Sequence, residues 1–102
     1  MEHYRVEILK AKELRGNIIE SLYNLYPQEV TINTLKQLLR YKGYTYETEV
    51  QRAMYYLQGK GYISLVANEG EVEYWENEIV LTPLGINLAE GDADDMGVNL
   101  NV

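Results

Sequence analysis

Cysteine is absent from this chain of 102 residues, which excludes disulfide bonds, thiolate metal ligands and a cysteine nucleophile. The single histidine is His3, near the amino terminus, and the only serines are Ser21 and Ser64, so no nucleophile can be paired with a base. The sequence also lacks a glycine-rich phosphate loop, and the acidic run from Glu69 to Glu78 lacks the spacing of a calcium-binding loop. We therefore predict that the protein is not an enzyme and uses no metal or other cofactor.

Long apolar runs are missing as well, and no stretch approaches the roughly 18 residues that a membrane-spanning helix needs. The amino terminus, MEHYRVEILKAKELRGN, alternates charged with apolar residues and has neither the apolar centre nor the cleavage site of a signal peptide. We expect a soluble protein with no membrane partner. The absence of cysteine fits a cytoplasmic location.

Phenylalanine is also absent, whereas the chain has ten tyrosines and one tryptophan. A tyrosine can pack its ring while its hydroxyl stays in water, which suits half-buried surfaces and interfaces. Two interpretations remain open at this point. Either tyrosine replaces phenylalanine in a small core, or some of the tyrosines belong to an interface.

Basic residues are missing from one part of the chain. Residues 1–60 hold all nine lysines and arginines against seven acids, a net charge of +2, while residues 61–102 hold nine acids and no base, a net charge of −9. The overall charge of −7 argues against a polyanionic partner, but its uneven distribution matters more. Such asymmetry can separate a part that faces nucleic acid from an acidic part that faces elsewhere.

Residues 2–26 predict a long helix. Apolar residues recur within it at helical spacing, namely Leu14, Ile18, Leu22 and Leu25. Pro27 ends the helix. Gly16 is a weak point, so the stretch is either one bent helix or two pieces that meet there. Because this helix is longer than a three-helix core needs, we predict a homodimer formed through it.

Two shorter helices are expected next. The first has Asn33 as its N-cap and ends at Gly43, where a glycine at the C′ position is typical. The second has Thr45 as its N-cap, acids in its first turn and Gly61 at its end, and it buries Val50, Ala53, Met54 and Leu57. A tight turn at Gly43 joins the two helices.

The periodicity changes after Gly61. The runs YISLV and EIVLT are β-prone, and together they predict a hairpin with a long tip. Thr82 and Pro83 suit the N-cap and first position of a short helix that extends to about Ala89. The predicted order is therefore three helices, a hairpin and a short helix in an α+β domain of residues 1–90.

Residues 91–102 read as an acidic linker followed by a tail. Apolar residues alternate strictly through the tail, at Met96, Val98, Leu100 and Val102. This alternation predicts a strand that adds to a sheet edge or to a partner chain. A frayed terminus is the alternative.

The order of these elements resembles that of the winged helix-turn-helix superfamily, in which the hairpin is called the wing. The segment LKQLLRYKGYTYETEVQRAMYYLQGKGYISL resembles its helix, turn, recognition helix and entry into the wing. The segment LTPLGINLAEG, followed by MGV, is similar to the small winged-helix proteins of Mu-like phages and prophages. This resemblance implies a three-helix core with a two-stranded wing and the function of a DNA-binding transcriptional regulator. The tails of that family tend to be basic after this point, whereas residues 99–102 here contain no base.

A recognition helix with the buried face given above leaves a polar face exposed to double-stranded DNA. Arginine can bind guanine through two hydrogen bonds, glutamine can pair with adenine, and the helix before it can place cations near phosphates. The candidate DNA-binding residues are Lys36, Arg40, Lys42, Thr48, Gln51, Arg52 and Tyr55. A polar face is also what any soluble helix shows to solvent, so the pattern alone is weak evidence for DNA binding.

The predicted wing carries five glutamates without a compensating base, namely Glu69, Glu71, Glu73, Glu76 and Glu78. Because the minor groove has a strongly negative potential, we expect this wing to stay out of it. The acidic wing could instead meet a protein partner. The alternative function is therefore a non-enzymatic module for protein–protein interaction, which uses its tyrosine-rich and acidic surfaces.

Overall fold

The computed structural model describes residues 2–67 and 73–100 and shows an α+β fold with four α-helices and a small antiparallel sheet, as expected from the sequence. The sheet has three strands rather than two, and a short 3₁₀ helix precedes the last of them. The elements follow in the order α1 (Glu2–Leu25), β1 (Val30–Thr31), α2 (Ile32–Tyr41), α3 (Glu47–Gly59), β2 (Ile63–Val66), η1 (Tyr74–Glu76), β3 (Glu78–Leu81) and α4 (Pro83–Glu90).

The expected hairpin is present as β2 and β3, which pair antiparallel with Ile63 opposite Leu81. Strand β1 pairs with the other edge of β3, with Val30 opposite Ile79, and gives the strand order β1-β3-β2. The sequence did not reveal β1 because a strand of two residues is too short to show alternation. Part of the hairpin tip, which includes Glu69 and Glu71, lies outside the described residues.

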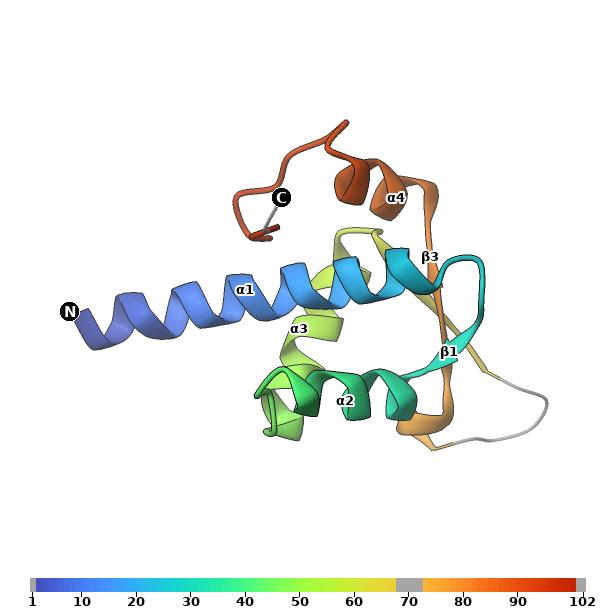
Figure 1. Ribbon diagram of the computed structural model, residues 1–102, viewed down its shortest axis with the longest axis horizontal. Helices are drawn as coiled ribbons and strands as arrows, with labels where there is room; N and C mark the ends of the chain where they lie inside the picture. The colour runs from blue at the N-terminus through green and yellow to red at the C-terminus, as the bar shows by residue number, and fades with distance from the viewer. Residues whose placement is uncertain (1, 68–72, 101–102) are drawn as a thin grey trace.

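One core joins the helices to the sheet. Its fully buried residues come from α1, α2, α3, β2 and α4, and the largest are Ile18, Ile19, Ile32, Leu35, Leu39, Val50, Met54, Leu57, Ile63 and Leu88. In Figure 1, α1 runs across most of the molecule and ends near the strands, with α2 below it and α4 above it. The amino-terminal end of α1 extends well past the other elements. None of the helices described is both long enough and apolar enough to cross a membrane.

The beginnings of α2 and α3 differ from the prediction by one or two residues. Thr31, not Asn33, is the N-cap of α2, and its Oγ1 accepts a hydrogen bond of 3.1 Å from the Thr34 N–H. The helix starts earlier because Ile32 is completely buried and belongs to its core face. Tyr46, not Thr45, is the N-cap of α3, and its side chain makes no capping hydrogen bond.

The predicted helix ends and the start of α4 are confirmed. Gly43 and Gly61 follow α2 and α3 with φ angles of 94° and 79°, which a residue with a side chain rarely adopts. Thr82 caps α4, with Oγ1 accepting a hydrogen bond of 3.1 Å from the Gly85 N–H, and Pro83 is the first residue of the helix.

Helix α1 is continuous through Gly16, which settles the choice between one helix and two pieces. The glycine is required by the tail, because a Cβ at Gly16 would collide with the carbonyl oxygen of Asn99. The Asn99 N–H in turn donates a hydrogen bond of 3.0 Å to the carbonyl oxygen of Lys12. The tail therefore crosses α1 in direct contact with its backbone.

Residues 96–100 form a turn and irregular structure, so the predicted strand at a sheet edge is wrong for them within the chain, while addition to a partner chain stays a prediction. Alternation still corresponds to burial in part: Val98 is buried and Leu100 packs against the core, but Met96 is 91% exposed. The tail is held by side-chain burial and by α1 instead of by a sheet edge. Val102 lies outside the described residues.

Candidate nucleic-acid interface

Helix α3 divides into a buried face and an outer face as its periodicity predicted. The buried side chains are Val50, Ala53, Met54 and Leu57. The four candidate residues on this helix, Thr48, Gln51, Arg52 and Tyr55, are all exposed, and Tyr55 reaches 82%. They form one continuous row along the outer face of α3, because positions three and four apart neighbour each other on a helix.

Two of the three cations predicted on α2 and its end are also exposed. Arg40 lies in the last turn of α2, where a positive charge is favourable near the helix carboxyl end. Lys42 follows as the C-cap residue, and its Nζ donates a hydrogen bond of 3.3 Å to Asn17 Oδ1 of α1. Both cations lie next to the turn that leads into α3.

Lys36 is not part of this exposed surface. Its side chain is only 14% exposed, and its Nζ forms an ion pair of 3.0 Å with Glu47 Oε1. The same Nζ lies 4.5 Å from the centre of the Trp75 ring, within the range of a cation–π interaction. Lys36 thus connects α2, α3 and η1, and its charge is already compensated.

Two exposed tyrosines on this side of the molecule were missed by the sequence analysis. Tyr41 ends α2 with 93% of its surface exposed, and Tyr46 precedes α3 with 70% exposed. With Tyr55, they place three tyrosine rings on and around the segment from α2 to α3. The helical periodicity of α2 could have indicated Tyr41, since it falls off the stripe of Leu35 and Leu39.

We call a set of eight exposed residues on α2, α3 and their turn the α2–α3 face: Arg40, Tyr41, Lys42, Tyr46, Thr48, Gln51, Arg52 and Tyr55. Its three cations are accompanied by two acids on α3, Glu47 and Glu49. Glu47 is the partner of Lys36, while Glu49 is exposed. The cations therefore retain a small excess on this face.

The hairpin side is acidic where it is described. Glu73 and Glu76 are exposed, and Glu78 is half-buried. A hydrogen bond with Glu29, together with desolvation and charge repulsion, raises the pKa of Glu78. Two carboxyl groups in contact indicate that this side attracts cations more readily than phosphates.

A groove lies between the amino-terminal half of α1 and the turn that begins α3, with a volume of about 610 Å³. On the α1 side, its walls include Glu7, Ile8, Lys10, Ala11, Glu13, Leu14 and Arg15. On the opposite side they include Lys42, Tyr44, Tyr46, Glu49, Arg52 and Ala53. The groove thus borders the α2–α3 face, since Lys42, Tyr46 and Arg52 belong to both.

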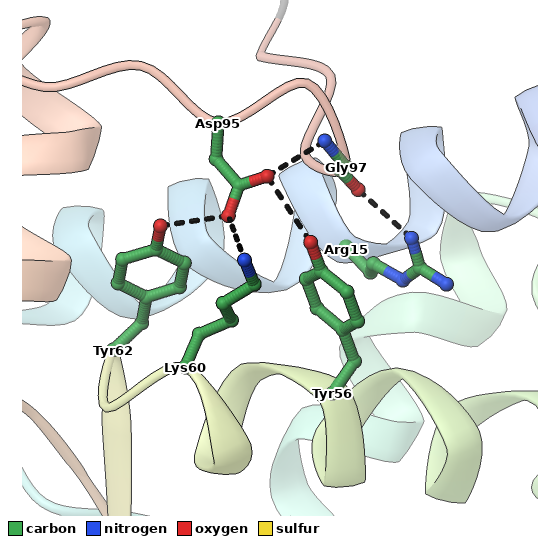
Figure 2. A network of polar contacts seen from close by, with 6 residues as sticks. All are labelled: Arg15, Tyr56, Lys60, Tyr62, Asp95 and Gly97. Atoms are coloured by element: carbon green, nitrogen blue, oxygen red, sulfur yellow. Dashed lines mark hydrogen bonds and ion pairs between the residues drawn. The ribbon is translucent and has the colours of Figure 1, made fainter.

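The tail is fastened close to this groove by a polar network around Asp95 (Figure 2). Tyr62 donates a hydrogen bond of 2.7 Å to one carboxylate oxygen of Asp95, and Tyr56 donates one of 3.1 Å to the other. The backbone N–H of Gly97 donates a hydrogen bond of 2.7 Å to Oδ1 of Asp95, the oxygen that also accepts from Tyr56. Lys60 Nζ lies 3.9 Å from Oδ2, the oxygen that accepts from Tyr62. We call this set the Asp95 clasp.

Ionisation within the clasp follows from these contacts. Burial alone would raise the pKa of Asp95, but the hydrogen bonds from Tyr62, Gly97 and Tyr56 and the charge of Lys60 together lower it. Conversely, the hydrogen bond to Asp95, with smaller contributions from burial and nearby charge, raises the pKa of Tyr62 to about 12. At neutral pH Asp95 is therefore a carboxylate that accepts from the neutral hydroxyl of Tyr62.

Arg15 links the clasp to the groove. Its guanidinium lies 4.0 Å from the centre of the Tyr56 ring, and one of its terminal nitrogens donates a hydrogen bond of 3.0 Å to the carbonyl oxygen of Gly97. Its Nε is buried without a hydrogen-bond partner among the described residues. The same side chain lines the groove.

Comparison of the chain with protein-family models, with curated proteins and with solved structures finds no match in any of the three.

Proposed function

We propose that the protein is a DNA-binding regulator of the winged-helix type, which reads duplex DNA with the α2–α3 face. The order of elements supports this fold: three helices, a β-hairpin and a short helix, with a tight turn between α2 and α3. The observation that carries the functional proposal is the outer face of α3, where Thr48, Gln51, Arg52 and Tyr55 form one exposed row.

Each residue type on this row has a contact that it can make in a major groove. Arg52 can donate two hydrogen bonds to guanine, and Gln51 can pair with adenine. Thr48 and Tyr55 can donate their hydroxyls to phosphate oxygens. Arg40 and Lys42 would lie beside the backbone and fix the position of α3, as phosphate contacts do in protein–DNA complexes.

The electrostatic part of such binding is small for a single copy. Lys36 is committed to Glu47, so three cations remain on the face, Arg40, Lys42 and Arg52. Three phosphate contacts give a slope of roughly −2.7 for log affinity against log salt, so affinity should fall about 40-fold between 50 and 200 mM salt. A second copy would contribute the same again, which favours a dimer as the DNA-bound form.

The test is a titration of mixed-sequence duplex DNA at several salt concentrations. We expect binding at low salt that weakens with the slope given above, and no binding at low ionic strength would refute the proposal. Arg52→Ala should weaken binding by roughly 5- to 150-fold if the arginine contacts a base. Lys12→Ala is the control, because it removes a positive charge from α1 at a residue that belongs neither to the α2–α3 face nor to the groove walls.

The exposed tyrosines support a second candidate, a module for protein–protein interaction. Tyr41, Tyr46 and Tyr55 lie on the same face as Arg40 and Arg52, and tyrosine and arginine are enriched among residues that dominate protein interfaces. The acidic hairpin would be the other surface available to such a partner. This candidate predicts that mixed duplex DNA does not bind even at low salt, so the same titration separates the two.

A further inference from the structure

The amino-terminal part of α1 carries apolar side chains that no described element covers. We call residues 5–11 the overhang, and within it Val6, Ile8 and Leu9 are 45%, 38% and 54% exposed. In Figure 1 this end of α1 extends beyond α2, α3 and the tail. The overhang continues the 24-residue helix α1, and because helices in proteins are stabilised chiefly by packing of an apolar face, its exposed apolar side chains suit a packing partner.

The groove described above begins where the overhang joins the body of the molecule. Ile8 and Ala11 belong to both, and the groove continues to Leu14 of α1 and Ala53 of α3. A helix with exposed apolar residues thus lies beside a hollow on the same chain whose walls combine apolar with charged residues.

We propose that the groove of each chain receives the overhang of a second copy, with the two α1 helices antiparallel about a two-fold axis. In such a contact the same surface serves on both subunits, so the groove side of each overhang, which includes Ile8, is covered and each groove is filled at once. The proposal goes beyond DNA binding and does not depend on it.

The charges within the groove favour a reversed copy of the same helix. Glu7 and Lys10 both line it, and they flank Ile8 and Leu9 in the sequence. Consider an antiparallel alignment in which Ile8 is level with Leu9 of the partner subunit. Glu7 is then level with Lys10 of the partner subunit, and Lys10 is level with Glu7 of the partner subunit. Neither Glu7 nor Lys10 forms an ion pair with another described residue of its own chain. Two ion pairs would therefore form across the axis without breaking any.

Arg15 gives the groove a further preference for an occupant with hydrogen-bond acceptors. Its buried Nε has no hydrogen-bond partner among the described residues, although the rest of the guanidinium is engaged. A buried donor without an acceptor costs free energy, and an acidic side chain that enters the groove could supply one.

The first test is sedimentation equilibrium of the full chain without DNA. We expect a concentration-dependent dimer, and Ile8→Glu should weaken self-association at least tenfold, a factor that corresponds to about 1.4 kcal/mol. Glutamate forms helices well, so the variant should keep its fold, which circular dichroism verifies. Met96→Glu is the matched control, because Met96 is 91% exposed and lies outside the groove. A wild-type monomer at about 1 mM, a concentration at which even a weak dimer with a dissociation constant of that order is populated, would overturn the proposal.

Charge exchange provides the second test. Glu7→Lys sets lysine against lysine across the axis, and Lys10→Glu sets glutamate against glutamate, so each single variant should dimerise less than wild type. The double variant Glu7→Lys with Lys10→Glu restores opposite signs and should recover the wild-type dimer. A double variant no better than the two single variants would show that these helices do not pair in this way. Since no DNA is present, either outcome leaves the DNA titration to be judged separately.

Discussion

Replacing Asp95 with asparagine should release the tail while leaving the rest of the fold in place. The carboxylate accepts three hydrogen bonds, from Tyr62, Tyr56 and the Gly97 N–H, and its side chain is only 8% exposed. An asparagine has one acceptor oxygen instead of two and turns an N–H₂ group toward the donors on the other side. At least one buried donor then loses its acceptor.

The magnitude follows from the kind of bond that is lost. A hydrogen bond to a charged group contributes about 1.5–3 kcal/mol, and neighbouring bonds are not additive, so we expect tail docking to weaken by about 2–3 kcal/mol. That range corresponds to an increase of about 30- to 150-fold in the equilibrium constant for opening the tail. Local opening of this kind does not require the core to unfold.

Amide hydrogen exchange measured by NMR can follow this step at one atom. The Asn99 N–H donates to the Lys12 carbonyl oxygen across α1, so it is protected only while the tail is docked. In Asp95→Asn its protection should fall by the factor given above, while amides within α2 keep theirs. Asp94→Asn is the matched control, since Asp94 is the exposed neighbour with the same charge.

The reasoning is refuted if the Asn99 amide of Asp95→Asn exchanges as slowly as in wild type. It is equally refuted if Asp94→Asn has the same effect, because the loss would then come from net charge and not from the clasp.

The same experiment has a pH dependence with a defined sign. The pKa of Asp95 is lower in the folded chain than in an unfolded one, so its stabilisation is complete above the ordinary carboxyl pKa of about 4. It is lost as the pH falls through the lowered folded value. Wild type should therefore release its tail at acidic pH, and this dependence should be much reduced in Asp95→Asn.

Two further substitutions test the packing. Gly16→Ala should stabilise the helical conformation of α1 by about 1 kcal/mol, because alanine has a higher helix propensity than glycine. It should also displace the tail, because the new Cβ would collide with the Asn99 carbonyl oxygen. We therefore expect faster exchange of the Asn99 amide while α1 melts no earlier than in wild type. Leu57→Ala should lower the free energy of unfolding by about 2–5 kcal/mol, since Leu57 is fully buried in the core, and denaturation by urea measures this. Met54→Leu keeps the volume of a fully buried side chain and should cost less than about 1.5 kcal/mol.

The parts of the fold that the sequence predicted are those that depend on local periodicity and on turn residues. The outer face of α3 follows from the spacing of its buried residues, and Thr82 and Pro83 define the start of α4 without any information about neighbours. Gly43 and Gly61 likewise mark helix ends, because a positive φ angle is a local requirement.

What the sequence could not reveal depends on contacts between distant residues. Lys36 was predicted to face DNA because it is a lysine on a short helix. Its burial against Trp75 and its ion pair with Glu47 depend on how α2, α3 and η1 come together. Strand β1 exists only because Val30 meets Ile79 of β3, far along the chain. No pattern within a single segment contains these pairings.

The abundance of tyrosine and the acidity of residues 61–102, which looked like separate features of the sequence, are connected in the structure. Tyr23 donates a hydrogen bond of 2.6 Å to Glu90, and Tyr56 and Tyr62 donate to Asp95. Phenylalanine at these positions would fill the same space but leave the carboxylates without their donors. Some of the acidic charge is therefore used to hold α4 and the tail against α1 and α3, and only the remaining acids are available to a partner.

The tyrosines also fall into two sets. Those half-buried against the core pack as phenylalanine would and keep a hydroxyl that can form a hydrogen bond. Those on the α2–α3 face are exposed. Replacement of phenylalanine in the core thus holds for the half-buried tyrosines, while an interface role for the exposed ones stays a prediction.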